Sequence, residues 1–198
     1  STALALTHDT ATGAGYGIGA ARGITGGRKG YKSALFEGGI GVPFIARWPG
    51  TIDASKVDKT SMISAVDLLP TFCELAGVTL PESYKPDGVS QVASLKGEAS
   101  VGRTKPLYWK MNSPWPAQKA RPYHWVSYAI VDQQWKLLSN KDASHVELFD
   151  LGKDPYEKRD LKEMHPEVAV RLLKKLDQWK ATLPAKPTGD VFSTERSN

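Results

Sequence analysis

The sequence predicts an α/β protein in which a region of strands and helices precedes a small antiparallel sheet covered by a helix. The first half combines short apolar runs with one long helical pattern. The second half holds four short runs rich in β-branched and aromatic residues, followed by an amphipathic pattern that begins at Pro166. We therefore expect two units, residues 1–98 and residues 99–198.

Strands and one helix define the first unit. Residues 3–7 and 42–48 are apolar enough for short strands, and Pro49-Gly50 would end the second one. Apolar residues recur every three or four positions over residues 60–77, which predicts a helix that Pro70 bends or divides. Gly77 suits the C-terminal end of that helix.

A glycine-rich stretch separates the two predicted strands. Residues 11–31 contain eight glycines, so a regular helix or a packed strand is not expected there. Gly15-Tyr-Gly17-Ile-Gly19 fits a dinucleotide-binding fingerprint only loosely, because no helical pattern follows it. A long glycine-rich loop in a compact chain is either functional or disordered, and we expect no nucleotide site here.

The second unit is predicted to be a small antiparallel sheet with a helix. Its four runs lie at residues 106–109, 125–131, 135–138 and 146–149, with polar turns between them. Asp132-Gln133-Gln134 would connect the middle pair as a hairpin. Pro166 suits the first turn of a helix, and one stripe of it would be apolar: Val168, Leu172, Leu173, Leu176 and Trp179.

Composition excludes several classes of protein. The net charge of +5 is spread along the sequence, so we expect no nucleic-acid partner. No apolar stretch approaches 18 residues, and we therefore expect no membrane partner. The single cysteine, Cys73, rules out a disulfide within the chain.

Lys32 is the first candidate for chemistry. It follows a glycine-rich loop and stands five residues before Glu37-Gly38-Gly39, a sequence that would fix the direction in which the chain leaves the loop. A fixed ammonium group stabilises an oxyanion that develops during a reaction. A lone lysine before a turn is nevertheless an ordinary surface residue, so the surrounding sequence has to decide.

That surrounding sequence resembles the formylglycine-dependent sulfatases, of the arylsulfatase and N-acetylgalactosamine-6-sulfatase types. The family carries Lys-x-x-x-(Tyr/Phe)-Glu-Gly-Gly-x-x-(Val/Glu)-Pro, and this chain matches it from Lys32 to Pro43. Further matches follow in the same order and extend the resemblance over residues 3–182: Asp67-Leu-Leu-Pro70-Thr71, Asp87-Gly88-Val-Ser90, Trp135-Lys136-Leu137 and Glu147-Leu-Phe149-Asp150 with Asp154-Pro155-Tyr-Glu157.

The resemblance implies an alkaline-phosphatase-like fold and specific site residues. Residues 1–98 would be the C-terminal part of the central α/β domain, and Lys32 would contact the sulfate. Asp9 would be a calcium ligand; Thr10 stands where the family carries asparagine, and its hydroxyl is a poorer ligand. Glu37, Gly38 and Gly39 would form a structural turn, with backbone angles at the two glycines that other residues avoid. His124 is a weaker candidate for substrate contact.

The resemblance also implies a reaction that this chain does not perform alone. The sequence has no Cys/Ser-x-Pro-x-Arg, the segment that supplies the formylglycine nucleophile in the family. We therefore expect a C-terminal part that shares calcium with an N-terminal part of the same enzyme. The complete enzyme would hydrolyse a sulfated carbohydrate or an aryl sulfate, in the periplasm, in the lysosome or after secretion.

Two other functions remain open. The positive charge and the aromatic residues would also suit a non-catalytic module that binds anionic polysaccharides. Thr10, together with Gly41 where many sulfatases carry arginine, would suit a degenerate sulfatase-like fragment.

Overall fold

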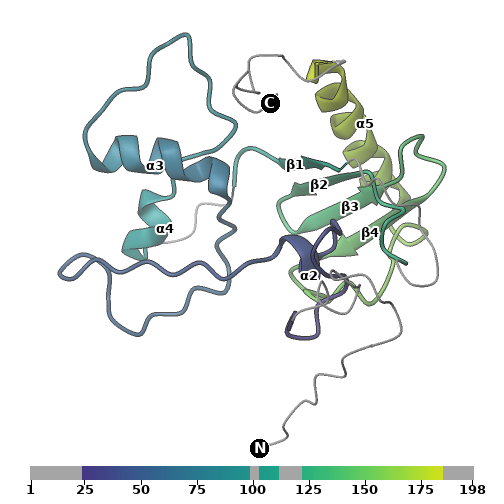
Figure 1. Ribbon diagram of the computed structural model, residues 1–198, viewed down its shortest axis with the longest axis horizontal. Helices are drawn as coiled ribbons and strands as arrows, with labels where there is room; N and C mark the ends of the chain where they lie inside the picture. The colour runs from purple at the N-terminus through teal and green to yellow at the C-terminus, as the bar shows by residue number, and fades with distance from the viewer. Residues whose placement is uncertain (1–23, 99–102, 112–121, 185–198) are drawn as a thin grey trace, which may run out of the picture.

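The computed structural model describes residues 24–98, 103–111 and 122–184. Figure 1 shows a sheet with a long helix in one half of the molecule, and two short helices with long connections in the other. The short helix α2 (Glu37–Ile40) lies beside the sheet, where the chain passes from one half to the other. The predicted strand at 3–7 lies outside the described residues.

The sheet has four antiparallel strands, which confirms the small antiparallel sheet that the sequence predicts, and their order is β1-β2-β3-β4. The predicted hairpin is confirmed, because Asp132 pairs with Trp135 and the turn residue Gln133 has a φ of 54°. The strands are β1 (Leu107–Lys110), β2 (Tyr128–Asp132), β3 (Trp135–Ser139) and β4 (Val146–Asp150).

Helix α5 (Pro166–Thr182) covers one face of this sheet, which confirms the predicted amphipathic helix. Its buried residues Leu172 and Leu176 join a cluster with Ile130, Leu137 and Leu148 of the strands. Since neighbouring residues of a strand point to opposite faces, this cluster takes only every second residue of β3. Polar contacts add to it, because Arg171 and Lys175 of α5 each donate to Asp132 at 2.7 Å.

The opposite face of the sheet is covered by the segment that carries Lys32. Ala34, Leu35 and Phe36 are almost fully buried and pack against Ala129, Leu138 and Phe149. The sequence did not predict this contact, which crosses the expected boundary at residue 98. The division into residues 1–98 and 99–198 stays a prediction.

The other half of the molecule contains η1 (Ala65–Asp67), α3 (Leu68–Leu75) and α4 (Val92–Lys96). The helix predicted over residues 60–77 is therefore shorter, and Pro70 lies in its first turn, where it interrupts no hydrogen bond. Gly77 ends it as predicted, with a φ of 66°, and the amide of Val78 donates to the carbonyl of Cys73 at 2.8 Å.

Buried Asp67 connects three segments of this half through its carboxylate. Its carboxylate accepts hydrogen bonds from the amides of Ser64 and Val89, at 2.8 and 2.9 Å, and pairs with Arg103 at 2.6 Å. The side chain of Asp67 is fully buried and that of Arg103 nearly so. This ion pair connects the start of α3 with the segment that leads into β1.

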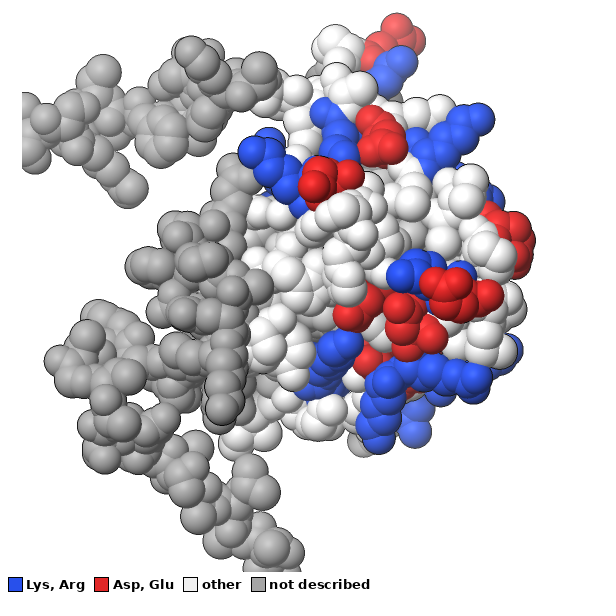
Figure 2. All heavy atoms as spheres, turned by 90° about the vertical axis from the view of Figure 1, so that its right-hand side faces the viewer, with Lys and Arg blue, Asp and Glu red and all other residues white. Residues whose placement is uncertain are grey.

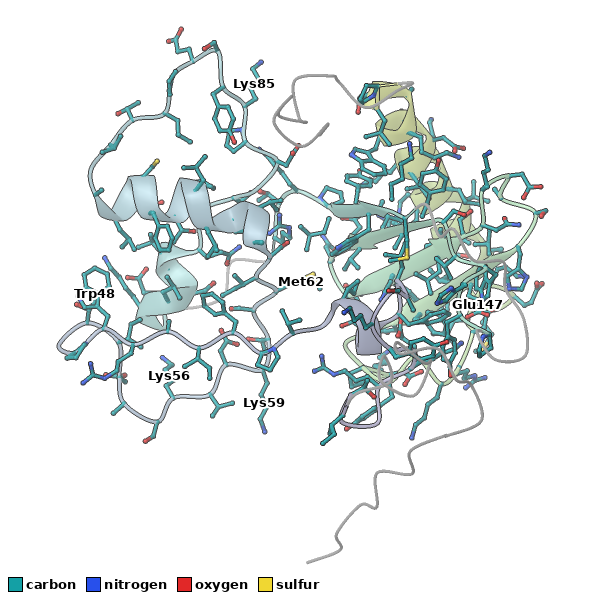
Figure 3. All side chains as sticks on the ribbon, viewed as in Figure 1. Trp48, Lys56, Lys59, Met62, Lys85 and Glu147 are labelled. Atoms are coloured by element: carbon teal, nitrogen blue, oxygen red, sulfur yellow. The ribbon has the colours of Figure 1, made fainter. Side chains whose placement is uncertain are left out.

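The strand predicted at residues 42–48 is wrong. This segment has no strand neighbour among the described residues, and Val42, Phe44 and Ile45 are exposed. A strand needs a neighbour to hydrogen-bond its backbone. Figure 3 places Trp48 at the far end of this extended connection and Met62 between the two halves.

No helix in the described ranges is both long enough and apolar enough to cross a membrane.

Candidate functional site

Lys32 lies at the tip of a tight turn. The amide of Ala34 donates to the carbonyl of Tyr31 at 3.0 Å, so Lys32 and Ser33 are the two central residues. Ser33 has a φ of 71°, an uncommon angle for a residue other than glycine. Tyr31 and Ala34 are buried on either side, while Lys32 is exposed. The fold thus fixes both flanks of the turn and leaves the lysine side chain open to solvent.

Lys32 lines a pocket of about 750 Å³. Arg28 lines the same pocket and brings a second cation, and Gly38, Gly41 and Tyr156 form other parts of its wall. The pocket thus combines residues on both sides of α2 with a residue that follows β4. Two cationic side chains at one pocket suit an anionic ligand.

Glu37 is part of a buried charge network, which we define as Glu37, Lys136 and Glu157. The ammonium group of Lys136 lies 2.8 Å from Oε1 of Glu37 and 2.9 Å from Oε1 of Glu157. The amide of Glu37 donates to Oε2 of Glu157 at 2.6 Å. Lys136 and Glu157 are fully buried.

Burial shapes the chemistry of this network. It raises the pKa of the Glu157 carboxyl, and the neighbouring ammonium of Lys136 opposes that rise. Arg28 stands at the edge of the network, 4.0 Å from Oε2 of Glu37. The main partners of Glu37 are thus side chains from distant parts of the sequence, and the structural role expected of it stays a prediction.

Gly38 and Gly39 follow Glu37 at positions where a side chain would collide with the backbone of the loop. Neither has the positive φ that the sequence led us to expect, since both lie in α2. A β-carbon at Gly39 would lie 2.1 Å from the carbonyl oxygen of Ala34, and one at Gly38 would lie 2.4 Å from that of Gly30. The loop folds back so closely on α2 that no side chain fits.

Lys29 ties the same loop to the sheet. Its ammonium group pairs with Glu147 at 2.9 Å and lies 4.5 and 5.0 Å from the ring centres of Phe36 and Phe149. Figure 3 shows Glu147 on the sheet side of the molecule. Cation–π contacts of this kind add to an ion pair that is partly buried.

The structure brings His124 close to the Lys32 turn. The ring centre of His124 is 6.1 Å from that of Tyr31, the residue before Lys32. Asp9 and Thr10 lie outside the described residues. Within residues 24–98, 103–111 and 122–184, no three His, Cys, Asp or Glu side chains group as metal ligands. The substrate contact by His124 and the calcium site stay predictions.

The sequence predicts no site role for Lys136, Glu157 or Arg28, although Lys136 and Glu157 lie in segments that resemble the sulfatases. A usable signal existed for Lys136, because it occupies the same face of β3 as buried Leu138. A charged residue at an inward position of a strand requires a buried partner of opposite charge. Glu157 has a φ of 54° in an irregular connection, where periodicity gives no information.

The fold and this loop define the C-terminal part of a sulfatase. Residues 28–182 match the family described as N-sulphoglucosamine sulphohydrolase, C-terminal, and the chain belongs to that family. Similar solved structures include sulfatases of alkaline-phosphatase-like fold. One, from work on glycosaminoglycan metabolism by Bacteroides thetaiotaomicron, is 25% identical with a TM-score of 0.59 and covers 79% of this chain and 32% of that one.

Curated relatives agree with this assignment. An N-acetylgalactosamine-6-O-sulfatase of Bacteroides thetaiotaomicron is 28% identical over 77% of this chain and 30% of its own length. The human steryl-sulfatase is 31% identical over 83% of this chain and 32% of its own length. The chain therefore spans about a third of the length of the relatives that it matches.

Proposed function

We propose that this chain is the C-terminal part of a sulfatase and that Lys32 contacts the sulfate group of the substrate. The observation that carries the proposal is the position of Lys32 on a turn with buried flanks, at a pocket that it shares with Arg28. The sulfatase motif around Lys32 and the family assignment support the same role.

The chemistry of sulfate-ester hydrolysis explains why a lysine is useful there. Cleavage of the ester bond builds negative charge on the sulfuryl oxygens and on the departing oxygen. An ammonium group that is already in place stabilises that charge without reorganising during the reaction. The fixed flanks of the turn would provide this preorganisation, and the exposed side chain would remain accessible to substrate.

The nucleophile would come from a part of the enzyme outside this sequence. The proposed partner is an N-terminal part with formylglycine and further calcium ligands, which would complement Asp9 and Thr10. The uncovered apolar side chains support such a partner, because proteins rarely leave many of them in water. They gather in the half that carries α3, and include Phe44, Ile45, Val57, Leu69 and Phe72.

A sulfated carbohydrate is the proposed substrate class, with an aryl sulfate as the alternative. The relatives include an N-acetylgalactosamine-6-O-sulfatase. A similar structure, 25% identical with a TM-score of 0.50, was solved in complex with its substrate D-glucosamine-2-N,6-O-disulfate. These names describe the relatives, and they support a sugar sulfate for this chain by similarity.

The test compares lysine variants in the complete enzyme, in which this chain is joined to the nucleophile-bearing part. We expect Lys32→Ala to lower kcat for 4-nitrophenyl sulfate by about 10²- to 10³-fold, as for removal of other oxyanion contacts. Lys85→Ala is the control, since this exposed lysine lies far from the sheet (Figure 3). Equal turnover by wild type and Lys32→Ala would overturn the proposal.

The separate 198-residue chain gives a second result. It should not hydrolyse the aryl sulfate, because it has no nucleophile motif. No turnover by the complete enzyme, together with heparin retention that Lys32→Ala leaves unchanged, would favour the polysaccharide-binding alternative. Figure 2 gives that alternative little support on one face of the molecule, where basic and acidic side chains are interspersed.

A further inference from the structure

We propose that Lys136 and Glu157 are positioning residues for the reaction, which act through Glu37 to hold the Lys32 turn in place. This inference rests on the proposed function of Lys32. Its basis is the buried charge network, in which one fully buried ammonium group bridges two carboxylates at 2.8 and 2.9 Å.

The network fixes Glu37 through both its backbone and its side chain. The amide of Glu37 donates to Glu157 at 2.6 Å, and its carboxylate accepts from Lys136. Phe36, the preceding residue, is fully buried against the sheet. These contacts join the start of α2 to β3 and to the connection that follows β4.

The position of Glu37 affects Lys32 because a backbone hydrogen bond closes the loop that contains both the turn and the start of α2. The amide of Gly38 donates to the carbonyl of Lys29 at 2.7 Å, which joins the two ends of the segment that contains the turn. Gly38 also lies against the carbonyl of Gly30, where a β-carbon would approach to 2.4 Å. A shift of Glu37 would therefore displace the base of the loop and, with it, the turn at its tip.

The buried charge network has a high desolvation free energy, and this indicates that it serves to position Glu37 and not to add stability. Moving charged groups out of water is expensive, and apolar residues of similar size often give equal or better stability. Leu138, two residues further on the same face of β3, shows that this face accepts apolar side chains. A lysine there adds a hydrogen bond to Glu37 and an ion pair with Glu157, which a leucine or methionine would lack.

The test is a double-mutant cycle in the complete enzyme, with 4-nitrophenyl sulfate as substrate. We expect Lys136→Met to lower kcat at least 10-fold with little change in KM. We expect Lys32→Ala combined with Lys136→Met to be no slower than Lys32→Ala alone, because a positioning residue has no effect once its target is absent. A purely structural role would instead give effects that multiply.

A second measurement keeps the inference testable if Lys136→Met folds poorly. Glu157→Gln is nearly isosteric, and hydrogen exchange of the complete enzyme reports on the loop directly. We expect the amides of Gly38 and Gly41 to exchange at least 10-fold faster in this variant, while those of Leu137 and Leu148 stay unchanged. Glu163→Gln, whose side chain is 91% exposed, is the control and should change neither set.

The outcomes separate this inference from the proposed function. If Lys32→Ala leaves turnover unchanged, the proposed function fails. If Lys32→Ala slows turnover but the cycle shows multiplying effects, the positioning role alone is wrong. Unchanged exchange at Gly38 and Gly41 in Glu157→Gln would also overturn it.

Discussion

Glu157 is a carboxylate that the fold buries completely beside Lys136 and Glu37. Burial raises its pKa, and Lys136 offsets part of the rise. A group with a raised pKa contributes stability that is fully present below its unfolded pKa, about 4.3 for glutamate. This contribution is lost as the pH rises through the higher folded value.

Replacing Glu157 should therefore change how stability depends on pH. For Glu157→Gln we expect the free energy of unfolding to fall less than that of wild type as the pH rises above about 4. The difference should be about 1.4 kcal/mol for each unit by which the pKa is raised. Urea unfolding at several pH values measures it, with Glu163→Gln as the exposed control. Identical pH profiles for wild type and Glu157→Gln would contradict this account.

The sequence predicts the turn at Lys32, but it does not predict the side chains that contact Glu37. The motif from Lys32 to Pro43 indicated the turn and its fixed exit. Lys136 and Glu157 are 99 and 120 residues from Glu37 along the chain, and such pairs follow from the tertiary fold alone. Asp9 and Thr10 lie outside the described residues, and the calcium site stays a prediction.

The sheet and α5 are predictable because their patterns are local. Alternating apolar residues and polar turns mark the strands, and a stripe repeated every three or four residues marks the helix. Both patterns agree with the way in which the two elements pack. Leu172 and Leu176 face the sheet, while Val170, between the apolar positions of the stripe, is 67% exposed.

This packing predicts the cost of shortening side chains on α5. Leu172→Ala should lower the free energy of unfolding by about 2–5 kcal/mol, because it leaves a cavity against Ile130 and Leu148. Val170→Ala is the matched control on the exposed side and should change it by less than about 0.5 kcal/mol. Urea unfolding of the complete enzyme measures both. Equal midpoints for the two variants would show that α5 does not pack on the sheet in this way.

The extended segment at residues 42–48 shows where local patterns fail. Its apolar composition predicted a strand, and yet the described part of the chain provides no neighbour for it. The apolar positions of α3 behave similarly, since Leu69 and Phe72 are about half exposed. An apolar composition indicates that a segment favours burial. It does not indicate which other segment packs against it, because that depends on the tertiary fold.

The two halves of the protein differ in how well they bury their apolar residues. The half with the sheet has a core on both faces of the sheet, formed by the Lys32 segment on one side and by α5 on the other. The half with α3 and α4 leaves many apolar side chains uncovered. Since the chain spans about a third of its relatives, this uneven burial agrees with a proposed partner that covers the second half.

A crystal structure of the complete enzyme with inorganic sulfate bound would test the role of Lys32 most directly. We expect the ammonium nitrogen of Lys32 to lie within about 3 Å of a sulfate oxygen, at the pocket that Lys32 and Arg28 line. A sulfate bound at the nucleophile with the Lys32 side chain pointing into bulk solvent, several ångströms away, would contradict the account.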